Sequence, residues 1–156
     1  MGNNINDYDK FAEKRQQDLI NGMKPSHRFV EKNMMKSMIT DLKNKKILML
    51  GCGTGEESKL LETFGATSKY LIGIDLSEKS IEIAKKTYPD IDFVVGDMND
   101  LQFENECFDF VYSSLAIHYN DTPERTYKEV YRVLKPDGLF LFSVGHPLRW
   151  GQKKRT

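Results

Sequence analysis

The chain has 156 residues, which is enough for one compact domain with its own core and too few for two. Basic and acidic residues number 23 each, so no net charge favours a nucleic acid or an anionic membrane as a partner. Apolar stretches such as Leu139–Val144 are far shorter than the roughly 20 residues that span a bilayer, so we expect no membrane span.

The N-terminal segment has a helical pattern without the features of a signal peptide, so we expect a cytoplasmic protein. Apolar residues recur at helical spacing from about Asp7 to Leu42, which predicts one or two amphipathic helices. Pro25 and Ser26 are expected to open the second helix. We interpret residues 1–45 as a helical lid or cap whose methionine-rich stripe serves mainly for packing.

From Lys46 onward, short apolar runs alternate with helical patterns. The predicted strands are Ile47–Leu50, Tyr70–Ile74, Phe93–Val95, Phe108–Ser113 and Leu139–Val144. The predicted helices run from Gly55 through Phe64, from Ser77 as N-cap to the residue before Pro89, and from Thr122-Pro123 to the Lys135–Gly138 turn.

This alternation predicts an α/β fold with a parallel sheet covered by helices on both faces. Right-handed crossovers favour a doubly wound, Rossmann-like sheet, which binds ligands at the carboxyl ends of its strands where the winding direction reverses. We expect a single domain, with residues 46–145 as its core and residues 146–156 as a basic tail exposed to solvent.

A glycine-rich turn, Gly51-Cys52-Gly53-Thr54-Gly55, follows the first predicted strand and opens a helix. Glycines there permit positive φ and the close approach of a ligand to the backbone. Glu56 and Glu57 follow directly and would repel a pyrophosphate at the helix N-terminus, so the loop favours a ligand without phosphates. The alternative is that both acids simply face water in the first turn of the helix.

Two further acids follow predicted strands. Asp75 ends the second strand, where a carboxylate can accept hydrogen bonds from both hydroxyls of a ribose. Asp97 follows the third strand and can accept from an adenine amine, while Met98 can lie against the ring. Turn formation by Gly96-Asp97 is the competing explanation.

These motifs, in this order, resemble the class I S-adenosylmethionine-dependent methyltransferases, and most of all their type 11 methyltransferase domain. Phe108-Asp109-Phe110-Val111 and Arg132–Gly138 complete the pattern. The resemblance implies the strand order 3-2-1-4-5 and a cofactor held by the three glycines, Asp75, Asp97 and Met98. It also assigns Cys52, Leu76 and Ser113 to the cofactor site, with S-adenosylhomocysteine as the product.

Two departures from the family pattern stand out. Met49 replaces the acid that usually lies two residues before the first glycine, which removes one contact to the cofactor or its loop. The usual last two strands of the sheet are absent, so we expect 139–144 to be an unpaired apolar edge that a second copy, the N-terminal segment or the tail covers.

Methyl transfer from a sulfonium needs mainly the alignment of donor and acceptor. His118, after the fourth strand, is the candidate general base, although a packed or hydrogen-bonded histidine is the more ordinary interpretation. Tyr119 and His146 are weaker candidates for the wall of the acceptor pocket.

The sequence thus predicts a methyltransferase that acts on a small molecule. The alternative is a shortened S-adenosylmethionine-binding domain without transferase activity. An NAD-linked oxidoreductase is disfavoured by Glu56, which stands where a dinucleotide enzyme has its third glycine. We expect no nucleic-acid, membrane or metal partner.

Overall fold

The computed structural model describes residues 26–145, and within them a five-stranded parallel sheet. The helices are α2 (Ser26–Met38), α3 (Glu57–Glu62), α4 (Glu78–Thr87) and α5 (Pro123–Val133), with short 3-10 helices η1 (Ser68–Tyr70) and η2 (Ile117–Tyr119). The strands are β1 (Ile47–Leu50), β2 (Leu71–Asp75), β3 (Asp92–Val95), β4 (Phe108–Ser114) and β5 (Leu134–Ser143).

The strand order is β3-β2-β1-β4-β5, and all four neighbouring pairs are parallel, which confirms the doubly wound, Rossmann-like α/β fold. The winding direction reverses between β1 and β4, where Leu48 lies opposite Val111. The four residues of β1 are buried on both faces, which explains the uninterrupted apolar run Ile47–Leu50. In a doubly wound sheet the ligand-binding crevice lies at this reversal, which here is at the carboxyl ends of β1 and β4.

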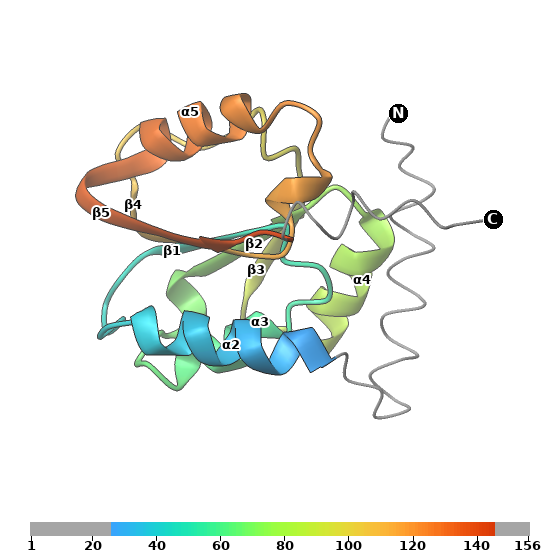
Figure 1. Cartoon of the computed structure of the whole chain (residues 1–156), viewed down its shortest axis with the longest axis vertical. Coiled ribbons are helices and arrows are strands. Elements are labelled where there is room, and N and C mark those ends of the chain that lie inside the picture. The colour runs from blue at the N-terminus through green and yellow to red at the C-terminus, as the bar shows by residue number, and fades with distance from the viewer. Residues whose placement is uncertain (1–25, 146–156) are drawn as a thin grey trace, which may run out of the picture.

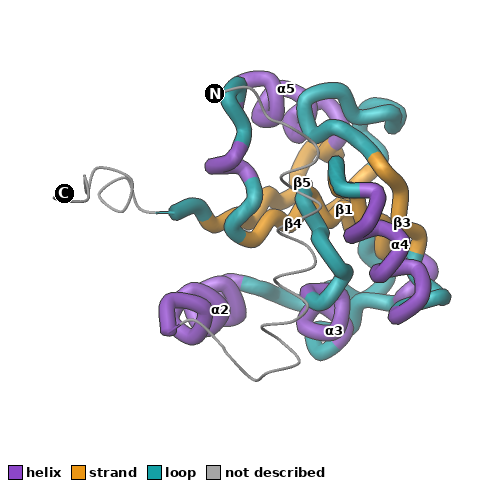
Figure 2. Tube along the Cα trace, turned by 90° about the vertical axis from the view of Figure 1, so that its right-hand side faces the viewer, coloured by secondary structure: helices purple, strands orange, loops and turns teal. Residues whose placement is uncertain are grey.

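Helices cover both faces of the sheet (Figure 1). α5 lies on one face, and its Val130 and Val133 pack with Leu48 and Val111 in one buried cluster. α2 and α3 lie side by side on the opposite face (Figure 2), where Met35 of α2 and Leu61 of α3 share a second cluster. The sheet is thus the middle of three layers, with a separate apolar core on each side.

The helix boundaries follow the local sequence signals closely. α2 begins at Ser26, as predicted, and α5 begins at Pro123 in the first helical position after Thr122. Ser77 caps α4, because its side chain accepts a hydrogen bond from the Ser80 amide at 3.1 Å. α3 is shorter than predicted, and the chain turns through Thr63 and Phe64 to Gly65, whose φ is +94°.

Four strand predictions are wrong at their ends. β3 begins one residue earlier than predicted, at Asp92, and β4 ends one residue later, at Ser114. Tyr70 belongs to η1, so β2 is shifted by one residue to Leu71–Asp75. β5 begins at Leu134 and already pairs there with Phe108, but the next pair is Phe110 with Leu139. The Lys135–Gly138 turn is therefore a bulge inside the strand, with Asp137 at a φ of 42°.

β5 lies at one end of the described sheet, as its sequence predicted, and exposes apolar side chains. Leu139, Phe142 and Val144 are 54%, 40% and 45% exposed. Phe142 stacks on Phe140, with ring centroids 4.7 Å apart, and Tyr127 of α5 packs beside both rings. That a second copy of the chain pairs with this edge stays a prediction.

Candidate functional site

Loops from three strands converge at Gly51, directly after β1. Gly51 has a φ of +62°, and a Cβ atom built there would lie 2.3 Å from the Cβ of Ala116 and 3.5 Å from the Cε of Met98. Ala116 follows β4 and Met98 follows β3, so these loops meet at the β1 loop. Only glycine fits here, because the backbone conformation and the space both exclude a side chain.

Asp75 ties the end of β2 to the glycine loop. Its Oδ2 accepts a hydrogen bond from the Gly53 amide at 2.8 Å, and its Oδ1 accepts one from the Ser77 amide at 2.9 Å. The Cys52 amide donates to the Ile74 carbonyl at 2.9 Å, which continues the parallel pairing into the loop. Asp75 thus joins the end of β2 both to the glycine loop and to the residue that caps α4.

Cys52, in the loop, and Ser113, in β4, contact the neighbouring strands β2 and β1. The Sγ of Cys52 is 2.9 Å from where a Cβ on Gly73 would stand, and the ring of Phe93 fills the adjacent space. Ser113 is fully buried and donates its hydroxyl to the Leu50 carbonyl at 3.0 Å. The predicted contact of Cys52 and Ser113 with a cofactor stays a prediction.

The loop after β3 contains the predicted adenine-binding residues. Asp97 is exposed, and its Oδ1 accepts a hydrogen bond from the Asn99 amide at 2.8 Å, so it also forms the turn that the sequence offered as the alternative. Met98 is partly buried against the core on the α5 side. Leu76, after β2, is partly buried at the same end of the sheet.

The segment after β4 carries the predicted acceptor-side residues. Leu115 takes a φ of 51°, and η2 follows at Ile117–Tyr119. The ring of His118 lies against that of Tyr119, with centroids 4.1 Å apart, and Tyr119 is 47% exposed. The proposed role of His118 as a base stays a prediction, and His146 lies outside the described residues.

Glu57 is not a first-turn acid that faces water, since only 7% of the residue is exposed. Its Oε1 forms an ion pair with Lys32 of α2 at 2.9 Å, and its Oε2 accepts a hydrogen bond from the Tyr112 hydroxyl at 3.2 Å. Burial, and then the charges of Glu57 and Glu31, raise the pKa of Tyr112 far above its usual value. The phenol is therefore a neutral donor at physiological pH.

Glu31 makes a second link between α2 and the sheet that the sequence reasoning missed. Its Oε1 accepts hydrogen bonds from the hydroxyls of Ser114, at the end of β4, and Ser143, at the end of β5. The helical pattern of 26–42 gave no sign of this link, because an acid between apolar positions normally faces solvent. α2 is thus fixed beside the acceptor-side ends of the strands.

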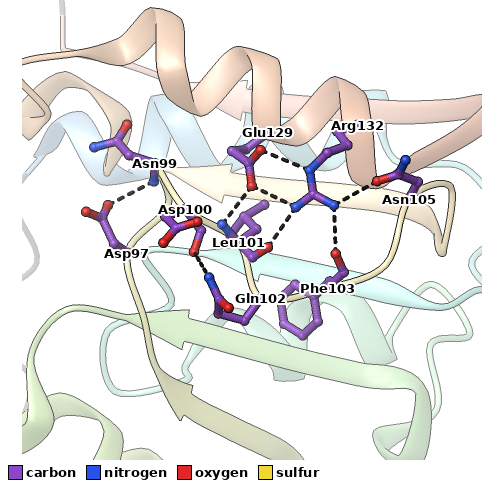
Figure 3. Close-up of polar contacts among 9 residues, drawn as sticks. All are labelled: Asp97, Asn99, Asp100, Leu101, Gln102, Phe103, Asn105, Glu129 and Arg132. Atoms are coloured by element: carbon purple, nitrogen blue, oxygen red, sulfur yellow. Dashed lines mark hydrogen bonds and ion pairs between the residues drawn. The ribbon is translucent and has the colours of Figure 1, made fainter.

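The connection from β3 to β4 is held from outside by α5 (Figure 3). Glu129 accepts from the Leu101 amide at 2.8 Å, and Arg132 donates to the carbonyls of Leu101 and Phe103 at 2.7 Å and to Asn105 at 2.9 Å. The hydrogen bonds from Arg132 lower the pKa of Glu129 below its usual value, against the effect of its partial burial.

The comparisons with known proteins agree with this geometry. A family model described as a methyltransferase domain matches residues 48–142, which is well over half of the chain. The chain therefore belongs to the methyltransferase domain family. The resemblance to class I S-adenosylmethionine-dependent methyltransferases, drawn from the sequence motifs, is confirmed.

Individual relatives extend the match. The phthiotriol/phenolphthiotriol dimycocerosates methyltransferase of Mycobacterium tuberculosis is 36% identical over 69% of this chain and 40% of its own length. An uncharacterized protein of Haemophilus influenzae is 34% identical over 95% of this chain and 61% of its own length. The chain thus spans about half the length of such relatives.

Among solved structures, the S-adenosylmethionine-dependent methyltransferase of Mesorhizobium loti is similar, with a TM-score of 0.68 and 35% identity. The match covers 74% of this chain and 54% of that one. None of the helices between Ser26 and Gly145 has the length and apolar character needed to cross a lipid bilayer. Within the same residues, no group of three or more histidine, cysteine or acidic side chains is arranged to hold a metal ion.

Proposed function

We propose that the chain binds S-adenosylmethionine in the crevice at the carboxyl ends of β1 and β4, beside the end of β2, and transfers its methyl group to a small-molecule acceptor. The observation that carries the proposal is the hydrogen bond between Asp75 and the Gly53 amide, which joins an acceptor for ribose hydroxyls to a loop of positive-φ glycines. Membership in the methyltransferase domain family supports the same reaction.

The groups around the glycine loop fit this cofactor better than a phosphorylated cofactor. Gly51 lets the loops that carry Met98 and Ala116 pack closely against the glycine loop. The hydroxyl of Thr54 donates to Glu56 at 3.4 Å, which places a carboxylate beside the glycine loop. A carboxylate tolerates a sulfonium cation and an amino group, whereas it repels a pyrophosphate.

When bound, the cofactor supplies a methyl group already activated by its sulfonium leaving group. The residues of the chain then have to bind the cofactor and the acceptor, orient them and exclude water. Asp75 would hold the ribose, Asp97 and Met98 the adenine, and the backbone at Gly51 and Gly53 the methionine part. His118 would accept a proton where the acceptor must lose one.

A small-molecule acceptor is supported by the balanced charge of the chain, with 23 basic and 23 acidic residues, which offers no field for a polyanion. The mycobacterial relative is named for phthiotriol and phenolphthiotriol dimycocerosates, and a small-molecule acceptor for this chain is in keeping with that name. The hydrophobic side chains of Tyr119 and Leu115, after β4, would form part of the acceptor wall.

Calorimetric titration with S-adenosylhomocysteine tests the binding half of the proposal, with NADH as the control ligand. We expect saturable binding of the first and none of the second, and the reverse would exclude the proposal. The second half is tested by incubation with S-adenosylmethionine and a panel of small-molecule acceptors. Acceptor-dependent formation of S-adenosylhomocysteine supports transfer, whereas binding without turnover favours a domain that only holds the cofactor.

A further inference from the structure

Three side chains behind the crevice form a closed hydrogen-bonded ring. The carboxamides of Asn99 and Asn120 pair reciprocally, with Asn99 Nδ2 donating to Asn120 Oδ1 at 3.1 Å and Asn120 Nδ2 donating to Asn99 Oδ1 at 2.7 Å. Asn120 Nδ2 also donates to the Thr126 hydroxyl at 2.6 Å, and that hydroxyl donates to Asn99 Oδ1 at 2.9 Å. Thr126, in α5, is fully buried.

The ring joins the loop after β3 to the loop after β4. On one side, the Asn99 amide holds Asp97 at 2.8 Å, and Met98 lies between these two residues. On the other side, the Asn120 amide closes η2 by donating to the Ile117 carbonyl at 3.0 Å. Asn120 is therefore fixed to the segment that carries His118 and Tyr119.

The two loops also meet at the glycine loop, because Met98 and Ala116 are both near the vacant Cβ position of Gly51. The ring around Asn99 and Asn120 is a polar link between the same two segments, held against α5 by Thr126.

We propose that Asn99 and Asn120 are positioning residues that hold the adenine-binding loop and the acceptor-side loop at a fixed separation before the cofactor binds. This inference rests on the proposed function of the crevice. A loop that is already ordered loses less conformational entropy on binding, so the pair raises cofactor affinity without touching the cofactor. Asparagine suits the role because each carboxamide offers both donors and an acceptor.

The pairing makes the two asparagines one functional unit. Removal of either carboxamide leaves the other without its reciprocal partner, and Thr126 then keeps its hydrogen bond to only one of the two loops. The effects of Asn99→Ala and Asn120→Ala are therefore expected to be non-additive, since the first substitution already breaks the link.

The test is calorimetric titration of the whole chain with S-adenosylhomocysteine, well below the melting temperature of every variant. We expect Asn99→Ala and Asn120→Ala each to weaken binding about tenfold, which corresponds to about 1.4 kcal/mol. The double variant is expected to bind no more weakly than the weaker single variant. Asn105→Ala is the matched control: Asn105 lies in the same connection, but its side chain accepts its hydrogen bond from Arg132 of α5 rather than from the loop after β4.

The control separates positioning from a general loss of stability. We expect Asn105→Ala to keep the wild-type affinity even where its melting temperature falls. Equal affinity in wild type, Asn99→Ala and Asn120→Ala would overturn the inference, as would strictly additive losses in the double variant. A wild-type chain that binds no S-adenosylhomocysteine would instead refute the proposed function itself. If an alanine variant does not fold, Asn120→Gln takes its place, because it keeps the polarity and breaks the reciprocal geometry.

Discussion

Glu31 in α2 accepts a hydrogen bond from Ser143 at the end of β5, 112 residues later in the chain. The same carboxylate oxygen accepts from Ser114 of β4 at 2.9 Å, so one side chain joins a helix to two neighbouring strands. Charge-assisted hydrogen bonds of this kind are among the stronger ones in proteins.

Glu31→Ala is therefore expected to lower the free energy of unfolding by about 1–3 kcal/mol, because it leaves two serine hydroxyls without their acceptor. Urea denaturation measures the effect. Lys36→Ala is the control on the same helix, since Lys36 is exposed, and its effect should stay within about 0.5 kcal/mol. Equal effects of the two substitutions would show that the hydrogen bonds from Ser114 and Ser143 to Glu31 contribute nothing to stability.

Gly51→Ala is expected to lower the melting temperature and the affinity for S-adenosylhomocysteine together. The new methyl group would meet the Cβ of Ala116 at 2.3 Å and would force an alanine into a φ of +62°. Gly96→Ala is the control for stability, because the nearest atom to its Cβ position is Ile74 Cβ at 3.9 Å. Thermal unfolding gives the melting temperatures of both variants. A fall in the melting temperature of Gly96→Ala as large as that of Gly51→Ala would contradict the prediction.

Asp75→Ala is expected to weaken the binding of S-adenosylhomocysteine by about 1–3 kcal/mol, through the loss of charge-assisted hydrogen bonds. Part of the loss comes from the Gly53 amide, which loses its 2.8 Å acceptor and no longer orders the glycine loop. Calorimetry measures the change in affinity. An affinity equal to that of the wild type would remove Asp75 from the site.

Tyr112 should stay protonated in the folded chain well above pH 10. Burial and the neighbouring carboxylates raise its pKa, whereas an unfolded tyrosine ionises near pH 10. The raised pKa contributes stability that is complete below about pH 10 and is lost as the pH rises above it. Tyr112→Phe should therefore be less stable near neutral pH, because Glu57 loses a donor, but should lose less further stability in alkali.

Ultraviolet absorbance at alkaline pH follows the ionisation of the phenols directly. One tyrosine of the wild type is expected to ionise only together with unfolding, and Tyr112→Phe should lack that late step. Complete ionisation of all tyrosines while the near-ultraviolet circular dichroism remains native would show that Tyr112 is not held neutral.

Glu129→Gln is expected to make the free energy of unfolding depend less on pH in acid. The hydrogen bonds from Arg132 lower the pKa of Glu129, so the carboxylate contributes stability that is present above its unfolded pKa of about 4.3 and is lost as the pH falls through the lower folded value. Urea unfolding between pH 3 and pH 7 measures the slope. If the free energy of unfolding of the variant fell with acid pH as steeply as that of the wild type, the pair of Glu129 and Arg132 would not couple folding to pH.

The layer architecture and the position of the crevice could be predicted from sequence signals that span only a few residues. The apolar run Ile47–Leu50 marked a strand buried on both faces, and Ser77 marked the start of α4. The position of Asp75 beside the glycine loop also followed, because parallel strands bring their carboxyl ends to one edge. Hydrophobic periodicity and turn residues act within a few positions, so they can be recognised in a single sequence.

The contacts between distant segments could not be predicted in the same way. Glu57 looked like a first-turn acid, and only the folded chain brings Lys32 and Tyr112 to it. Asn99 and Asn120 are ordinary loop residues by composition, and their pairing depends on how two connections meet over α5. The bulge inside β5 was missed because Pro136 and Gly138 are equally typical of a turn that precedes a strand.

The attachment of residues 99–107 to α5 fixes the length of that connection. Surface connections normally accept extra residues, but Asn99, Leu101 and Phe103 are each bonded to α5, and the Cys107 amide donates to the Val133 carbonyl. One inserted residue would shift every later bond out of register with the helix, since a helix offers its side chains only at set intervals. Insertional mutagenesis should therefore find this stretch as intolerant as a core strand, although it contains no regular secondary structure.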